Sequence, residues 1–179
     1  FAEHADGTFE QGASAYEKRG VAVLVPEWDP TTCAKCNQCA YVCPHATIRP
    51  FALSEEELAA APANIKTAEK PIVKTNYKYT LAVSPMDCMG CGVCIGVCKT
   101  NSLKMVSKES QLPEQLVFDY CVANVTEKPE TTATINVVSS QYKKPLLEFS
   151  GSCAGCAETA YARLVTQLFG DRMYISNAT

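Results

Sequence analysis

Eight of the chain's eleven cysteines form two copies of one pattern, C-x2-C-x2-C-x3-C. Three cysteines spaced in this way can surround three corners of a cuboidal 4Fe–4S cluster within one tight loop, and in two-cluster ferredoxins the fourth cysteine ligates the other cluster. The pattern therefore predicts two 4Fe–4S clusters with crossed fourth ligands. The first cluster is expected to be held by Cys33, Cys36, Cys39 and Cys98. The second is expected to be held by Cys88, Cys91, Cys94 and Cys43.

Four thiolates also suit zinc, so a non-redox zinc module that mediates assembly is an alternative. Zinc ribbons, however, use two separated C-x2-C pairs, whereas here four cysteines fall within eleven residues, twice. Visible absorption separates the two interpretations, because iron–sulfur clusters absorb broadly at about 400 nm and bleach with dithionite. The spacing favours iron–sulfur clusters and, with them, single-electron transfer.

The two cysteine runs belong to an internal duplication. Each cysteine of the second run lies 55 positions after its counterpart in the first, and Leu103 matches Ile48 after the same shift. We therefore expect an α+β fold in which residues 28–107 form a bacterial ferredoxin-like domain of two similar halves. Residues 51–78 are an insert between the runs.

Local patterns predict the elements around the runs. Ser54 and Glu57 resemble a capping box, which predicts a short helix that stops at Pro62. The alternating apolar residues of 79–83 predict a strand that leads into the second run. The polar segment 108–145 contains prolines and a threonine-rich stretch, so we expect a connection with a little strand and no core.

Several positions are expected to be structural only. The lead-in segment 1–27 carries no site, and its apolar stretch 21–25 predicts a buried strand that Pro26 ends. Trp28 is expected to pack in the interior, and Cys121 is expected to be an ordinary buried cysteine.

The last part of the chain, residues 146–179, has the pattern of a βαβ unit, which would open a parallel α/β domain. Its predicted elements are strand 146–149, helix 157–169 and strand 173–176. The chain reaches Thr179 too early to complete such a domain.

A third cysteine pair, Cys153 and Cys156, forms a C-x2-C on the loop before the predicted helix. The pair could be a thioredoxin-like redox pair, half of a metal site, or two small buried residues. The helix N-terminus favours a thiolate at this place. Because two ligands cannot hold a 4Fe–4S cluster, a third cluster here needs ligands from beyond Thr179 or from another chain.

The chain resembles the pyruvate:ferredoxin (or flavodoxin) oxidoreductases over nearly its whole length, and the βαβ pattern with its C-x2-C is the most specific part of the likeness. The matching segments are Gly7-Thr8-Phe9, residues 16–20, 36–39, 42–45, 145–151, 153–156 and 166–173. Two departures are visible: Ala157 replaces the family's usual glycine, and Lys99 replaces a frequent proline. Neither departure removes a cysteine.

The resemblance implies a very long, usually homodimeric enzyme with thiamine diphosphate, Mg²⁺ and three 4Fe–4S clusters. Such an enzyme decarboxylates pyruvate, forms acetyl-CoA, and passes electrons singly to an external ferredoxin or flavodoxin. This chain would supply the two-cluster domain and the start of the thiamine diphosphate-binding domain, and by itself would not be catalytically active. Cys153 and Cys156 would be half of the ligands of the third cluster. Glu158 would lie near the thiamine cofactor, or would only add charge to the helix N-terminus.

Net charge and hydropathy limit the classes of partner and the location that this chain can have. The formal net charge is −3, and bound clusters would make the protein more acidic, which argues against nucleic acid. The sequence has no apolar run long enough to span a bilayer, and the clusters predict a reducing intracellular compartment, either cytoplasm or an organelle matrix. A free-standing two-cluster ferredoxin, or an electron-transfer subunit of another complex, is the alternative function. It explains eight cysteines but not the third pair.

Overall fold

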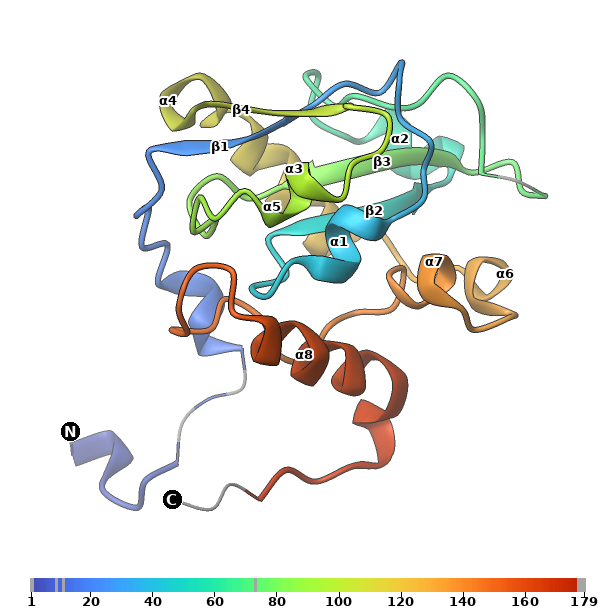
Figure 1. Ribbon diagram of the computed structural model, residues 1–179. Helices are drawn as coiled ribbons and strands as arrows, with labels where there is room; N and C mark the ends of the chain where they lie inside the picture. The colour runs from blue at the N-terminus through green and yellow to red at the C-terminus, as the bar shows by residue number, and fades with distance from the viewer. Residues whose placement is uncertain (1, 9, 11, 73, 177–179) are drawn as a thin grey trace.

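The computed structural model describes residues 2–8, 10, 12–72 and 74–176, which form two small antiparallel sheets surrounded by short helices (Figure 1). The strands are β1 (Leu24–Trp28), β2 (Ile48–Leu53), β3 (Lys78–Val83) and β4 (Leu103–Ser107). The α-helices are α1 (Gln38–Val42), α2 (Glu55–Ala59), α3 (Val93–Gly96), α4 (Lys108–Gln111), α5 (Glu114–Asn124), α6 (Pro129–Thr132), α7 (Val137–Ser140) and α8 (Ala157–Phe169). The 3₁₀ helices are η1 (Ala2–His4), η2 (Ala13–Tyr16) and η3 (Gly170–Arg172).

Strand pairing joins the two duplicated halves. The first half contributes β1, α1 and β2, and the second contributes β3, α3 and β4, yet β1 pairs with β4 and β2 pairs with β3. In these ladders Trp28 faces Leu103, and Ile48 faces Val83. The 55-residue shift maps Trp28 onto Val83 and Ile48 onto Leu103, so it exchanges the two pairs. The α+β fold with an internal duplication is confirmed.

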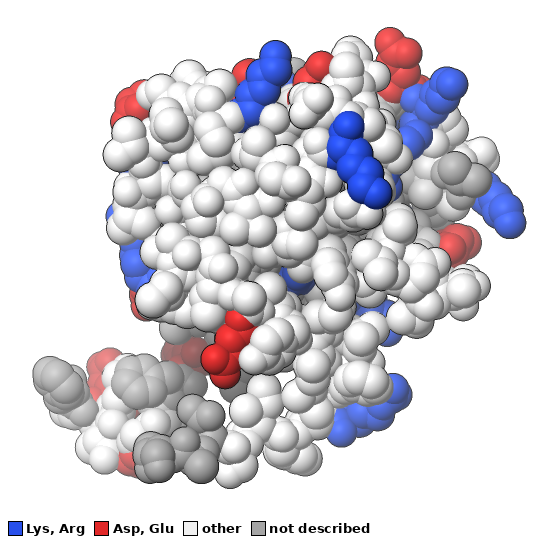
Figure 2. Space-filling model, viewed as in Figure 1, with Lys and Arg blue, Asp and Glu red and all other residues white. Residues whose placement is uncertain are grey.

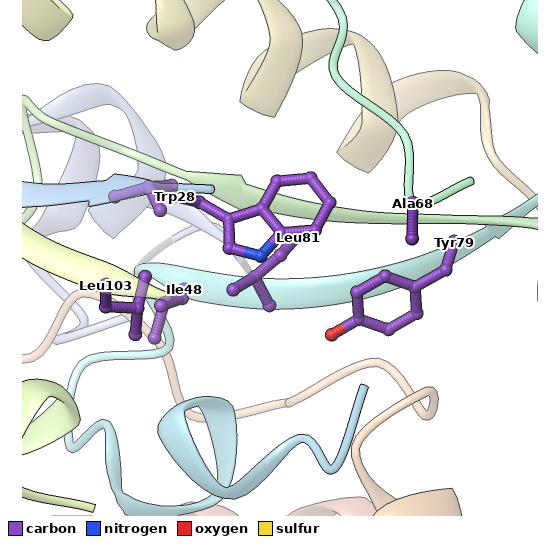
Figure 3. Packing of buried hydrophobic residues seen from close by; sticks show 7 residues of the cluster. Trp28, Ile48, Ala68, Tyr79, Leu81 and Leu103 are labelled. Carbon is purple, nitrogen blue, oxygen red and sulfur yellow. The ribbon is translucent and has the colours of Figure 1, made fainter. Parts of the chain in front are cut away.

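The main core lies between the sheets and the cysteine runs (Figure 3). Trp28 is 5% exposed, and its ring meets the Tyr79 ring edge-on at 5.8 Å, which confirms its predicted packing role. Burial of such apolar side chains stabilises the fold by about 1.5–3 kcal/mol for each residue. The core consists of Trp28, Ile48, Ala68, Tyr79, Leu81, Val83 and Leu103, with Cys33, Cys39, Cys43, Cys94 and Cys98 packed against it.

The insert follows the sequence prediction closely. Helix α2 begins with a complete capping box, in which the Glu57 N–H donates to the Ser54 hydroxyl at 3.2 Å and the Ser54 N–H donates to the Glu57 carboxylate at 2.8 Å. The helix ends at Ala59, before Pro62. The strand predicted over 79–83 is confirmed as β3.

The first strand is displaced from its predicted position. It spans Leu24–Trp28 and not residues 21–25, and Val23 is exposed. Pro26 lies inside the strand, opposite Met105. Proline is tolerated here because β1 has a neighbouring strand on one side only. On the open edge of the strand no ladder hydrogen bond needs the N–H that proline lacks.

The prediction that 108–145 has a little strand and no core is wrong, because this segment is helical and includes α5. Helix α5 buries Val117, Phe118 and Cys121 against the second core cluster. Pro113 stands at its N-cap, a helix end that proline does not interrupt. Cys121 is fully buried, as predicted.

The βαβ prediction holds only for its helix, which is α8. The described residues of 146–149 and 173–176 form no strand. Phe149 has a φ of 48°, and its N–H donates to the His45 carbonyl at 2.9 Å. The backbone N–H and C=O groups of a strand are satisfied by a neighbouring strand. In this segment a hydrogen bond to the His45 carbonyl satisfies the N–H of Phe149 instead.

Charged side chains are distributed unevenly between surface and interior. On the face shown in Figure 2, lysine and arginine side chains lie mainly toward the upper and right margins, and uncharged residues cover the middle. Two arginines are buried instead: Arg49 is 7% exposed and Arg163 is 1% exposed. Among the described helices, none is long and apolar enough to cross a membrane.

Candidate metal centre

The loop of the first cysteine run and the end of the second enclose one cavity of about 200 Å³. Core side chains of Tyr79, Leu81 and Leu103 form its apolar wall. Three cysteines of the first run meet the last cysteine of the second run here. The cysteines that line it are Cys33, Cys36, Cys39 and Cys98.

A second, smaller cavity of about 20 Å³ has the complementary set. Its wall includes Ile48 and His45. The cysteines that line it are Cys43, Cys88, Cys91 and Cys94. All eight cysteines therefore line the two cavities, and each cavity has three cysteines from one run and one from the other.

The first cavity, of about 200 Å³, suits a group of several atoms better than a single ion. Among the residues the structure describes, no three Cys, His, Asp or Glu side chains converge as ligands of one ion would. The first set of four thiols instead surrounds space for a group of several atoms. All eleven cysteines are free of disulfides, so the thiols remain available as ligands.

Backbone amides of the two loops point at cysteine sulfurs in the same way. The N–H of Lys35 donates to the Cys33 sulfur at 3.4 Å, and the N–H of Gly90 donates to the Cys88 sulfur at 3.4 Å. Both donors have left-handed backbone, with φ of 56° and 68°, which turns the amide toward the site. Such bonds stabilise a thiolate and help to set the reduction potential of a bound cluster.

Burial controls the ionisation of the thiols. Desolvation raises the pKa of Cys88 to about 11 and that of Cys94 to about 12. Desolvation also raises the pKa of Cys98, but hydrogen bonds from Ser102 and Thr100 outweigh it and lower that pKa overall. Metal binding must therefore displace protons from the buried thiols.

The third cysteine pair lies at the start of α8. Cys153 is exposed, and Cys156 is half-buried at the helix N-cap. Hydrogen bonds from the Thr159 hydroxyl and amide lower the pKa of Cys156. The only other cysteine outside the two runs, Cys121, is buried in α5. Glu158 is exposed in the first turn of α8.

The loop of this pair packs beside the second cavity. Gly155 lies between the two cysteines with φ of 74°, and a Cβ placed on it would lie 3.4 Å from the Cβ of Cys91. The close approach and the positive φ together favour glycine at this position. The loop and the second cysteine set are therefore neighbours.

Sequence reasoning missed two buried basic residues beside the first run. His45 is 2% exposed, lines the second cavity, and has Nδ1 at 3.1 Å from the Ser150 hydroxyl. Burial lowers its pKa. Arg163 reaches the same run from α8, and its Nε donates to the Cys43 carbonyl at 3.0 Å. The only sequence signal was the place of His45 just after the first run; Arg163 gave none.

The arrangement of two four-cysteine cavities across a duplicated α+β fold defines a class of protein. The family model described as "4Fe-4S dicluster domain" matches residues 32–102. The chain thus contains a ferredoxin-like 4Fe–4S dicluster domain and belongs among the electron-transfer iron–sulfur proteins.

Comparison with curated proteins identifies the family. The chain is 52% identical over 176 residues to pyruvate-flavodoxin oxidoreductase of Klebsiella pneumoniae and 48% identical over 182 residues to pyruvate:ferredoxin oxidoreductase of Moorella thermoacetica. It is 42% identical over 173 residues to mitochondrial pyruvate dehydrogenase [NADP(+)] of Euglena gracilis. Each match covers 97% of the chain, which spans 15% of the length of the first two relatives and 10% of the third. The chain belongs to the pyruvate:ferredoxin (flavodoxin) oxidoreductase family and corresponds to one segment of its enzymes.

Proposed function

We propose that this chain is the electron-relay portion of a pyruvate oxidoreductase and carries single electrons away from the site of pyruvate oxidation. The observation that carries the proposal is the crossed grouping of the cysteines, three from one run and one from the other in each cavity. A bound 4Fe–4S cluster supplies one-electron redox chemistry. The likeness to relatives extends over 97% of the chain, which a free-standing two-cluster ferredoxin would not explain.

The chain's own residues hold and insulate the clusters. In the proposal Cys33, Cys36, Cys39 and Cys98 ligate the first cluster, and Cys88, Cys91, Cys94 and Cys43 ligate the second. The amides of Lys35 and Gly90 bond to ligand sulfurs. The core around Trp28 keeps water from the inner side of the first site, and low polarity strengthens these bonds.

A third cluster is the natural role for Cys153 and Cys156 in the assembled enzyme. They would supply two of its ligands, and the other two would come from outside this chain. The contact between Gly155 and Cys91 supports an order in which electrons pass from this third cluster to the cluster of Cys88, and then to that of Cys33.

The remaining parts of the proposal rest on the family resemblance. The complete enzyme would bind thiamine diphosphate and Mg²⁺, with residues 146–179 as the start of that binding domain and Glu158 near the cofactor. It would use coenzyme A, form a homodimer, and reduce an external ferredoxin or flavodoxin in a reducing intracellular compartment.

Cysteine variants test the crossed ligand sets. The chain is purified without oxygen, its iron and sulfide are counted, and its reduced clusters are resolved by electron paramagnetic resonance. Cys98→Ser should perturb the same signal as Cys33→Ser, although the two residues belong to different runs. If Cys98→Ser instead perturbs the signal that Cys88→Ser perturbs, the crossed assignment is wrong. Cys121→Ala is the matched control and should change neither signal.

A further inference from the structure

Arg163 is a buried cation at the junction between α8 and the first cysteine run. It is 1% exposed. Its guanidinium donates to the carbonyls of Ala40, Tyr41 and Cys43 at 3.0, 2.7 and 3.0 Å. These carbonyls lie in the last turn of α1 and at its C-cap, where a cation is favoured by the helix dipole.

The neighbours of Arg163 do not neutralise it. Its Nη1 donates to the side-chain oxygens of Gln141 and Gln167, at 3.1 and 2.5 Å, and both acceptors are uncharged amides. Within the described residues, no carboxylate forms an ion pair with Arg163. Arg49, the other buried arginine, is paired with Glu148. A guanidinium stays protonated in proteins, so Arg163 is a buried charge without an anion among its contacts.

A buried charge is costly unless an opposite charge compensates it. Arg163 donates a hydrogen bond to the carbonyl of Cys43, and Cys43 lines the second cavity. A 4Fe–4S cluster held by four thiolates is a net anion, and one-electron reduction adds a further negative charge. An anionic group bound by Cys43 would therefore supply the compensating charge.

We propose that Arg163 is the buried counter-ion of the cluster ligated by Cys43, and that it raises the reduction potential of this cluster. The proposal rests on the ligand sets given above. A fixed positive charge in a low-dielectric interior attracts the reduced form more strongly than the oxidised form. Arg163 is a positioning and tuning residue, since its guanidinium contacts the backbone of a ligand and not the reacting atoms.

The two halves differ at this point, and the difference makes the effect specific. The 55-residue shift maps Ala40, Tyr41 and Cys43 onto Ile95, Gly96 and Cys98. Within the described residues, no arginine or lysine side chain donates a hydrogen bond to those three carbonyls. The cluster of Cys98 should therefore be indifferent to Arg163.

Two variants change the charge balance in different ways. Arg163→Gln removes the cation, and Gln141→Glu keeps Arg163 in place but sets a carboxylate against it in a site that is 4% exposed. Arg172→Gln is the control, because it removes an exposed arginine just after the same helix. Each cluster-loaded chain is assayed for iron and titrated under electron paramagnetic resonance, and the signal lost in Cys88→Ser identifies the cluster of Cys43.

We expect both Arg163→Gln and Gln141→Glu to lower the reduction equilibrium constant of that cluster at least tenfold, which is about 59 mV for one electron. The other cluster should shift less than twofold, and Arg172→Gln should shift neither. If Arg163→Gln loses iron, Gln141→Glu decides the matter. The proposal is overturned if Gln141→Glu with full iron moves neither potential, or moves both equally. A parent chain without two clusters would instead refute the ligand sets.

Discussion

The Thr47 hydroxyl oxygen lies 3.4 Å from the sulfur of Cys43. The 55-residue shift reproduces this relationship in the second half, where the Ser102 hydroxyl oxygen lies 3.3 Å from the sulfur of Cys98. Cys43 and Cys98, which are each grouped with the cysteines of the other half, thus share one feature. In both cases a hydroxyl four residues further along the chain lies close to the sulfur. Hydrogen bonds to ligand sulfurs are one of the terms that set cluster potentials.

Removing these hydroxyls should lower one potential at a time. A hydroxyl that donates to the sulfur draws charge from the thiolate and favours the reduced cluster, so Thr47→Val should lower the midpoint of the cluster that includes Cys43. Ser102→Ala should lower the other midpoint. Redox titration followed by electron paramagnetic resonance measures both, and each variant is the control for the other. Equal shifts of both clusters in either variant would contradict the assignment.

Folding of residues 28–107 should depend on the clusters. Five of the eight cysteines pack against the main core, and the first four-cysteine cavity has about 200 Å³ to fill. Without a cluster, the cavity beside the core stays unfilled. Cluster ligation therefore contributes to the free energy of folding. Anaerobic chelation of iron should therefore abolish the native circular dichroism. A cluster-free sample with an unchanged spectrum would refute this dependence.

Glu148→Gln should destabilise the chain strongly. Glu148 pairs with Arg49, whose side chain is 8% exposed and stacks over the rings of Phe118 and Phe149 at 5.2 and 5.3 Å. Loss of one partner leaves an uncompensated buried charge, which costs about 3–5 kcal/mol. Urea denaturation followed by circular dichroism measures the loss.

The control for Glu148→Gln is Glu17→Gln, which breaks an exposed Arg–Glu pair with Arg19. Exposed pairs contribute little, so the urea midpoint should stay where it is. Equal midpoints for the two variants would show that the Arg49 pair is no more important than a surface pair.

Two of the cysteines outside the runs, Cys156 and Cys121, should react with iodoacetamide in a fixed order. Hydrogen bonds from Thr159 lower the pKa of Cys156, whereas burial raises the pKa of Cys121 to about 12. Thiolate is the reactive form, so in the two-cluster chain Cys156 should be modified at lower pH than Cys121. Thr159→Val should move the Cys156 reaction to higher pH. Peptide mass spectrometry reads each site, and modification of Cys121 before Cys156 in the folded chain would contradict the assignment.

In the assembled enzyme, Cys153→Ala should break the step that precedes the two clusters of this chain. Iron should fall by the content of one cluster while both dicluster signals remain, and reduction of the external acceptor should slow strongly. Cys121→Ala provides the matched control. Full iron with normal acceptor reduction in Cys153→Ala would make the third pair structural.

The sequence predicted the features that spacing alone determines. The grouping of the eight cysteines follows from ligand spacing, the two similar halves follow from the 55-residue repeat, and α2 follows from the hydroxyl and carboxylate of Ser54 and Glu57. Such features depend on neighbours along the chain or on a repeat of it, so they can be recognised before any tertiary contact is known.

Features decided by distant contacts could not be predicted in this way. Residues 146–149 have strand-like composition, but the Leu146 N–H donates to the Thr166 hydroxyl at 3.1 Å and Phe149 takes left-handed backbone. Arg163 is an ordinary helix residue in sequence, and only the packing of α8 against α1 reveals its role. Val117, Phe118 and Cys121 in helix α5 have helical spacing, but the prolines and threonines around them favour a connection, so local composition alone does not predict this helix.

The crossed strand pairing constrains how this protein can be made. Strand β1 has no ladder partner until residues 103–107 have been synthesised, because it pairs with β4 and not with the nearby β2. The first half therefore leaves the ribosome with the edge of β1 unpaired and four thiols exposed. Both remain so until the insert and the second half have been synthesised. Long-range pairing of this kind slows folding and exposes the nascent chain to aggregation. The first ligand set lacks its fourth cysteine until Cys98 has been synthesised. We therefore expect that iron–sulfur assembly factors cannot build this cluster on a nascent chain stalled before Cys98, and that cluster insertion follows synthesis of the second half.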